Sequence, residues 1–167
     1  KLKASLLDTT KLSAMIFLLI AGATVFGHFF ALSRIPANLA TWVTMYNLPD
    51  FVVIFLVVLI YFLLGCFIDS LALILLTVPI FYPLIIGTMG YDPIWFGAVV
   101  ILVAVMGAIT PPVGLNLFIM KSVAPSLAVS SLFKGVWPFV LALYICVLLV
   151  IIFPEIAIWL PQVVYGS

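Results

Sequence analysis

The sequence contains few side chains that can ionise. Of its 167 residues only 7% are charged, and it has one histidine. The formal net charge of +1 comes without a basic patch or an acidic tail, so nothing favours a nucleic-acid partner. The chain also lacks a zinc-ligand spacing, a nucleophile–base pair and a phosphate-binding loop. We therefore do not expect an enzyme.

Cysteine is scarce as well. Cys66 and Cys146 both lie in apolar runs, where we expect small core residues rather than a disulfide. The sequence starts at Lys1 and shows no signal peptide, and we interpret it as part of a longer polypeptide.

Apolar side chains, in contrast, are abundant. They make up 68% of the sequence, and the mean hydropathy is +1.51. A soluble domain of this size could not bury so much apolar surface. Because apolar runs recur along the whole chain, we predict an all-α polytopic membrane protein with the bilayer as its solvent.

Three segments flank or connect the centre of the chain. Residues 12–32 are long enough to cross the hydrocarbon, and residues 136–153 form the last span. Residues 37–47 include Trp42 and Tyr46 and suit a helix that lies at the headgroups.

The apolar stretch 51–87 predicts a helical hairpin. As a single helix it would be about 55 Å long, far more than one bilayer needs. Its interruption is GCFIDS at residues 65–70, with no hydrophilic loop beside it. We therefore predict a re-entrant hairpin that enters and leaves the membrane by the same face, with residues 65–70 at a tip deep in the bilayer.

Placing Asp69 at the membrane centre would cost an insertion free energy on the order of 3 kcal/mol. It could cap the half-helix that starts near Leu71. It could also ligate a cation or carry a proton. These roles are compatible, and the sequence leaves them open.

The second interruption is GAITPPVG at residues 107–114. Pro111 and Pro112 have no N–H to bond the carbonyls of Gly107 and Ala108, so the helix must stop near Ala108 and restart near Val113. Free carbonyls in lipid cost several kcal/mol unless something binds them.

A cation would satisfy these groups. The negative end of the first half-helix points at the break, and Thr110 adds a hydroxyl. The restarting half-helix presents free N–H groups, which favour an anion. Asn116 either faces the same cavity or bonds a neighbouring helix. Broken helices of this kind form ion and substrate sites in secondary transporters, although a simple proline kink is the alternative.

The charges predict an orientation. With a cytoplasmic N-terminus and a re-entrant hairpin, Lys121 and Lys134 are cytoplasmic, whereas Asp50, Asp92 and Glu155 lie on the opposite face. Five of the six basic residues are then inside, as the positive-inside rule prefers.

Between about Asp50 and Pro161 the sequence contains, in this order, GCFIDSLALILLTVPIFYPLI, GYDPIWFGAVV, GAITPPVGLNLF, LFKGVWPFV and FPEIAIWLP. Together these segments resemble the C-terminal half of the large membrane subunit of tripartite ATP-independent periplasmic (TRAP) transporters. The resemblance implies one of two inverted repeats of an elevator-type carrier, with a hairpin and a broken helix. It also implies a multi-pass protein of the bacterial inner membrane and sodium-coupled uptake of an organic acid, such as a C4-dicarboxylate or sialic acid.

The resemblance implies three partners besides the bilayer. They are a small membrane (Q) subunit, a periplasmic substrate-binding (P) protein and the N-terminal half of the same large subunit. The family's first repeat is absent from this chain. Two other functions stay open: a proton-coupled carrier that uses Asp69, and a non-transporting scaffold subunit.

The expected organisation has three parts. Residues 1–50 form a scaffold span and an interfacial arm helix, residues 51–124 contain the transport-domain elements, and residues 125–167 form a cytoplasmic arm and the last scaffold span. The expected Na⁺ ligands are Gly65, Asp69, Gly107, Ala108, Thr110 and Pro111. The expected substrate-binding residues are Ser70, Val113, Gly114 and Asn116.

Overall fold

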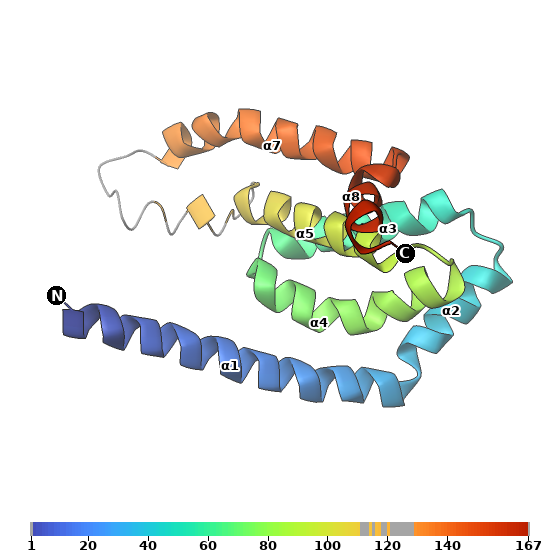
Figure 1. Ribbon diagram of the computed structural model, residues 1–167, viewed down its shortest axis with the longest axis horizontal. Helices are drawn as coiled ribbons and strands as arrows, with labels where there is room; N and C mark the ends of the chain where they lie inside the picture. Colours follow the sequence, from blue (N-terminus) through green and yellow to red (C-terminus); the bar gives the residue numbers. More distant parts are fainter. Residues whose placement is uncertain (1, 111–113, 115, 118–119, 121–128, 167) are drawn as a thin grey trace.

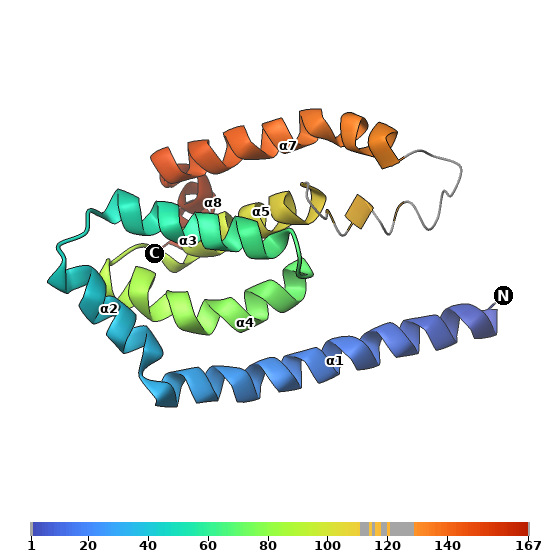
Figure 2. The same ribbon diagram turned by 180° about the vertical axis from the view of Figure 1, so that it is seen from behind.

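The computed structural model describes residues 2–110, 114, 116–117, 120 and 129–166. Within these residues every element is a helix and no strand occurs, which confirms the all-α prediction (Figure 1). The longest helices follow one common long axis. Helix α1 lies along one side of the molecule and α7 along the other, with α3, α4 and α5 between them, as Figure 1 and the reverse view in Figure 2 both show.

Helix α1 (Leu2–Ser33) begins ten residues before the predicted apolar span. No glycine or proline interrupts residues 2–11, and the hydroxyls of Thr9 and Thr10 donate back to carbonyls one turn earlier. At 1.5 Å per residue the helix is about 48 Å long, so it can extend beyond the hydrocarbon. Almost all of its large side chains are exposed.

A sharp turn at Arg34 leads into α2 (Ile35–Met45), the predicted arm helix. Arg34 has a left-handed backbone, with φ 57°, a conformation that ends one helix and redirects the chain. Pro36 lies in the first turn of α2, where its missing N–H removes no helical bond.

The central hairpin consists of α3 (Asp50–Gly65) and α4 (Ser70–Tyr82), followed by a π-helical turn, η1 (Pro83–Thr88). Figures 1 and 2 show α3 and α4 running in opposite directions. Along the long axis of the molecule, the turn at residues 66–69 that joins them lies between the two ends of α1. The structure thus places a helical hairpin here, and that it enters and leaves the membrane by the same face stays a prediction. The position of its tip inside the bilayer stays a prediction.

Helix α5 (Pro93–Ile109) returns beside α3 towards the tip. The carboxylate of Asp92 caps its first turn by accepting from the N–H groups of Ile94 and Trp95, at 2.7 and 3.3 Å. Helices α7 (Val129–Ile152) and α8 (Glu155–Tyr165) complete the described chain. The predicted span 136–153 thus belongs to a helix that starts seven residues earlier.

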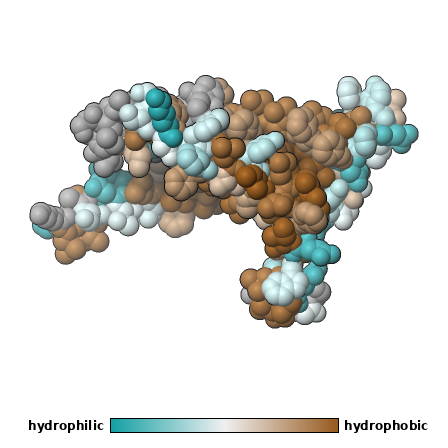
Figure 3. Space-filling view, turned by 90° about the horizontal axis from the view of Figure 1, so that it is seen from above, coloured by the Kyte–Doolittle hydropathy of each residue, from teal (hydrophilic) through white to brown (hydrophobic). Residues whose placement is uncertain are grey.

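In the described part of the chain, three helical stretches are long and apolar enough to cross a membrane: Ser5–Ser33, Ser70–Thr88 and Ser130–Ile152. Hydrophobic residues cover most of the middle of the face in Figure 3, and the hydrophilic residues gather mainly towards the ends of the long axis. This distribution suits a protein whose middle lies in hydrocarbon.

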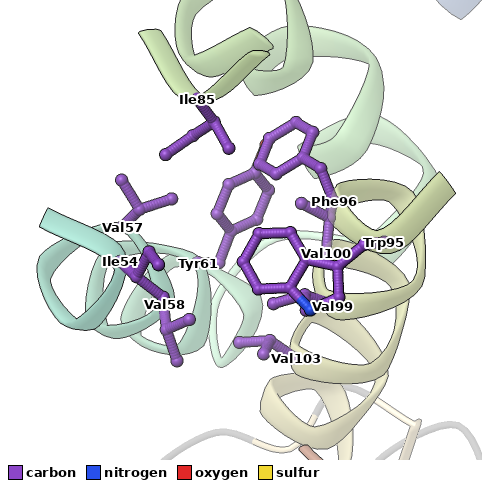
Figure 4. Close-up of a pocket in the computed structure, with 10 residues that line it drawn as sticks. All are labelled: Ile54, Val57, Val58, Tyr61, Ile85, Trp95, Phe96, Val99, Val100 and Val103. Carbon is purple, nitrogen blue, oxygen red and sulfur yellow. The ribbon is translucent and has the colours of Figure 1, made fainter. Parts of the chain in front are cut away.

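The buried core joins α3, α4, η1, α5 and α7. Trp95 and Tyr61 are its largest fully buried side chains, and both line a small cavity of about 10 Å³ with otherwise apolar walls (Figure 4). Both cysteines are free, as predicted. Cys66 is buried, but Cys146 is exposed on α7, so the core assignment was wrong for Cys146.

The helix directions place five of the charges that carry the orientation prediction towards two opposite ends of the molecule. The N-terminal ends of α1 and α7 lie at the same end of the long axis (Figures 1 and 2) and carry Lys11 and Lys134. Asp50, Asp92 and Glu155 stand at the starts of α3, α5 and α8, towards the opposite end. Lys121 lies outside the described residues, and the assignment of each end to a side of the membrane stays a prediction.

Candidate ion and substrate site

The hairpin tip lies directly against the end of α5. Gly65 and Gly107 are both buried and meet through their backbones. A Cβ on Gly107 would lie 2.8 Å from the carbonyl carbon of Gly65 and 2.9 Å from the carbonyl oxygen of Phe62, closer than side-chain atoms pack. Only glycine at position 107 allows this approach.

A second contact holds the same two segments together. The hydroxyl of Ser70, at the start of α4, donates to the carbonyl of Ala104 on α5 at 3.3 Å. Ala104 is fully buried. The structure therefore brings three of the predicted site residues, Gly65, Ser70 and Gly107, to one place.

Asp69 is the N-cap of α4, which confirms the capping role that the sequence left open. Its Oδ2 accepts from the N–H groups of Leu71 and Ala72, at 3.0 and 3.4 Å. The residue as a whole is exposed. Because an ionised carboxylate has about four lone-pair sites, this cap leaves Oδ1 available for a cation.

Helix α5 ends at Ile109, close to the predicted break. Thr110 has an extended backbone, and its N–H donates to the carbonyl of Gly107 at 3.1 Å. Its hydroxyl is buried and donates to the carbonyl of Met106. The Gly107 carbonyl and the Thr110 oxygen each keep a lone pair for a further partner. Ala108 is buried in this last turn.

The remaining predicted residues follow the break. Pro111 and Val113 lie outside the described residues. Gly114 is buried and has φ +59°, and a Cβ there would lie 3.4 Å from the carbonyl oxygen of Thr110. Asn116 is helical and exposed. Gly114 thus lies beside the end of α5, whereas no contact of Asn116 with the tip is seen among the described residues.

An apolar cavity opens next to Thr110. Its volume is about 310 Å³, and it separates α7 from α3 and α5. The side chains lining it are Phe55, Val58, Leu59, Phe62, Met106, Thr110, Trp137, Val140, Leu141 and Tyr144.

The electrostatics of the tip favour a cation. Helices α3 and α5 both end there, so the negative poles of two helices meet at the Gly65–Gly107 contact. The Asp69 carboxylate adds a negative charge at the neighbouring helix start. In the described part of the chain no group of three His, Cys, Asp or Glu side chains comes together. The available ligands are therefore carbonyl, hydroxyl and carboxylate oxygens, which suit a hard cation.

The sequence did not reveal Ala104 and Phe62 as partners of the tip. Both act through backbone carbonyls, which every residue has, so no residue type could mark them. A small residue at 104 is compatible with close helix packing, but it is a weak signal.

These features define a class of protein, the polytopic helical membrane proteins. In this chain a helical hairpin packs on the end of α5, which stops within an apolar stretch. This construction is typical of secondary transporters. The comparison of the sequence with known families gives the family itself. Residues 1–156 match the tripartite ATP-independent periplasmic transporter, DctM component. The chain belongs to this family, and the match extends N-terminal to the segment 50–161 that carried the sequence resemblance.

Curated relatives cover nearly the whole chain. It is 35% identical over 95% of its length to the sialic acid TRAP transporter large permease protein SiaM of Vibrio cholerae. It is 32% identical over 94% to the C4-dicarboxylate TRAP transporter large permease protein DctM of Pseudomonas aeruginosa. It is 31% identical over 83% to the isethionate TRAP transporter permease protein DctMQ of Oleidesulfovibrio alaskensis. The chain spans 37%, 36% and 21% of these three proteins.

Proposed function

We propose that this chain is part of the large permease subunit of a Na⁺-coupled secondary transporter that imports an organic acid. Relatives named for sialic acid and C4-dicarboxylate transport support that substrate class. The location would be the bacterial inner membrane, in several passes. The partners would be a periplasmic binding protein that delivers the substrate, a small membrane subunit and the rest of the large subunit. The isethionate relative's name, DctMQ, fits a permease that can be fused to its small subunit.

The observation that carries the proposal is the backbone contact between Gly65 and Gly107. It places the ends of α3 and α5 together, where their dipoles favour a cation. Sodium would bind oxygens of Gly65, Asp69, Gly107, Ala108 and Thr110, and carbonyls freed at Pro111 would complete the shell.

The substrate would lie on the other side of the tip. Helix α4 starts at Ser70, and the chain restarts as a helix beyond Gly114, so both segments present N-terminal ends that favour a carboxylate. We assign Ser70, Val113, Gly114 and Asn116 to this subsite.

Transport would follow an elevator mechanism, with residues 51–124 moving against residues 1–50 and 125–167. The contact between α1 and α4 supports a sliding boundary, because a Cβ on Gly27 would lie 3.4 Å from Cγ of Pro79. A glycine and a proline meet at this boundary, and among the described residues no hydrogen bond between side chains joins α1 to α4.

The test is uptake by the complete permease, reconstituted in proteoliposomes with its small membrane subunit and binding protein. We expect an imposed sodium gradient to drive uptake of an organic acid. A pH gradient without sodium should not. Uptake driven equally by protons would support the alternative in which Asp69 carries a proton.

A pair of threonine variants locates the ion. Thr110→Val removes the hydroxyl at the end of α5 and should raise the sodium concentration for half-maximal uptake several-fold. Thr24→Val is the matched control, because the Thr24 hydroxyl makes the same type of bond, to the carbonyl of Ile20 on α1, away from the tip. Equal sodium dependence of uptake in the two variants would contradict the assignment of Thr110 to the sodium site.

A further inference from the structure

Helix α7 has a carbonyl that its own helix cannot satisfy. In an α-helix the carbonyl of Val150 would accept from the N–H of residue 154. Residue 154 is proline and has no N–H. The preceding bond, from Phe153 N–H to the Leu149 carbonyl, is still present at 2.8 Å. Pro154 therefore leaves the Val150 carbonyl without a helical donor, at a position that is 5% exposed.

Trp95 of α5 supplies the missing donor. Its indole Nε1 donates to the Val150 carbonyl at 2.8 Å, and this bond is buried. Trp95 is 2% exposed and packs among apolar side chains of α3, η1 and α5 (Figure 4). A buried indole needs a partner for its N–H, and a buried carbonyl needs a donor. Each group thus satisfies the other, and the bond joins two residues of different helices that are 55 positions apart in sequence.

We propose that Trp95 is a positioning residue of the permease, and that its indole N–H replaces the hydrogen bond that Pro154 cannot make. The bond fixes the last turn of α7 against the first turn of α5. Asp92 holds the other partner in place, because its carboxylate caps the backbone N–H of Trp95 at 3.3 Å. The Trp95 side chain is therefore held at both ends, because its backbone N–H bonds Asp92 and its indole N–H bonds the Val150 carbonyl.

The bond has a consequence at the opposite end of the two helices. There the 310 Å³ cavity separates Trp137, Val140 and Tyr144 of α7 from Met106 and Thr110 of α5. Among the described residues, the Trp95–Val150 bond is the side-chain hydrogen bond that joins α7 to another helix, and it lies at the end of α7 away from this cavity. It therefore helps to set the position of α7 relative to Thr110. This part of the inference rests on the proposed function, since it assigns Thr110 to the ion site.

The test is a double-mutant cycle in the complete permease with its partner subunits. Trp95→Phe removes the N–H, and Pro154→Ala restores an N–H that can bond the Val150 carbonyl within α7. We expect Trp95→Phe to lower the thermal unfolding midpoint by about 2 °C in the wild-type background. In the Pro154→Ala background it should lower the midpoint less. An equal decrease in both backgrounds would overturn the proposal, because the indole would then act by filling space alone.

A second measurement does not depend on Pro154. Incorporation of 3-benzothienylalanine at position 95 keeps the shape of the ring and replaces its N–H by sulfur. We expect the same loss of stability as in Trp95→Phe, and a midpoint equal to the wild type would overturn the proposal. Trp137→Phe is the matched control for loss of an indole, since Trp137 is exposed.

Transport is measured separately on the same variants. Trp95→Phe should lower uptake at fixed sodium, and Pro154→Ala should restore part of it. Recovery of uptake in the double variant would exclude a role of ring volume alone. If the stability cycle shows coupling while no sodium-driven uptake occurs in any variant, the proposed function fails and the positioning role of Trp95 stands.

Discussion

A methyl group at Gly107 should separate the hairpin tip from α5. In Gly107→Ala the new Cβ would lie 2.8 Å from the Gly65 carbonyl carbon and 2.9 Å from both the Gly65 Cα and the Phe62 carbonyl oxygen. All three are backbone atoms, so no side chain can rotate away. The tip must retreat until these distances reach at least about 3.4 Å, the ordinary packing distance of a Cβ.

The cost of this retreat follows from overpacking in well-packed interiors, which is about 1–3 kcal/mol. If the docked tip is the form that binds sodium, the strain lowers the population of that form. At 1.4 kcal/mol per tenfold change, we expect the sodium concentration for half-maximal uptake to rise about tenfold. The Gly107 carbonyl is retained in the variant, so the effect reports the position of the tip and not the loss of a ligand.

The assay is sodium-dependent uptake by the reconstituted complete permease. Gly97→Ala is the matched control, because it adds the same methyl group to α5 where nothing lies within 4 Å. Gly65→Ala should have an intermediate effect, since its Cβ would be 3.2 Å from the Ala104 carbonyl oxygen. The expected order of impairment is therefore position 107, then 65, then 97. Equal sodium dependence of the variants at 107 and 97 would refute the reasoning.

Two further predictions concern the hairpin. Asp69→Asn keeps a good N-cap for α4 but removes the charge, so it should leave the thermal midpoint unchanged and raise the sodium concentration for half-maximal uptake. Asp69→Ala removes the cap as well and should also destabilise the protein by about 1 kcal/mol. Wild-type uptake by the Asn variant would show that Asp69 only caps the helix. A disulfide between cysteines at Gly27 and Pro79, whose Cβ positions lie 3.7 Å apart, has suitable geometry and should block uptake reversibly; undiminished uptake by the oxidised protein would exclude sliding of α4 along α1.

Several elements could be predicted because their causes are local. Pro111 and Pro112 lack the N–H groups that would continue a helix, and α5 ends at Ile109. Asp69 precedes an apolar run, and it caps α4. The composition alone placed the chain in the membrane. The N-terminal start of α1 was less predictable, because residues 2–11 mix charged, hydroxyl and apolar side chains and contain neither glycine nor proline to end a helix.

The sequence by itself determined that this protein is a bundle of apolar helices with two interruptions, because proline, glycine and capping chemistry act within about one helical turn. Only the tertiary structure decided which backbones meet. The contacts between Gly65 and Gly107, between Ser70 and the Ala104 carbonyl, and between Trp95 and the Val150 carbonyl join residues tens of positions apart. Every residue carries a carbonyl, so residue type cannot select the partner, and the packing of α3, α5 and α7 makes that selection.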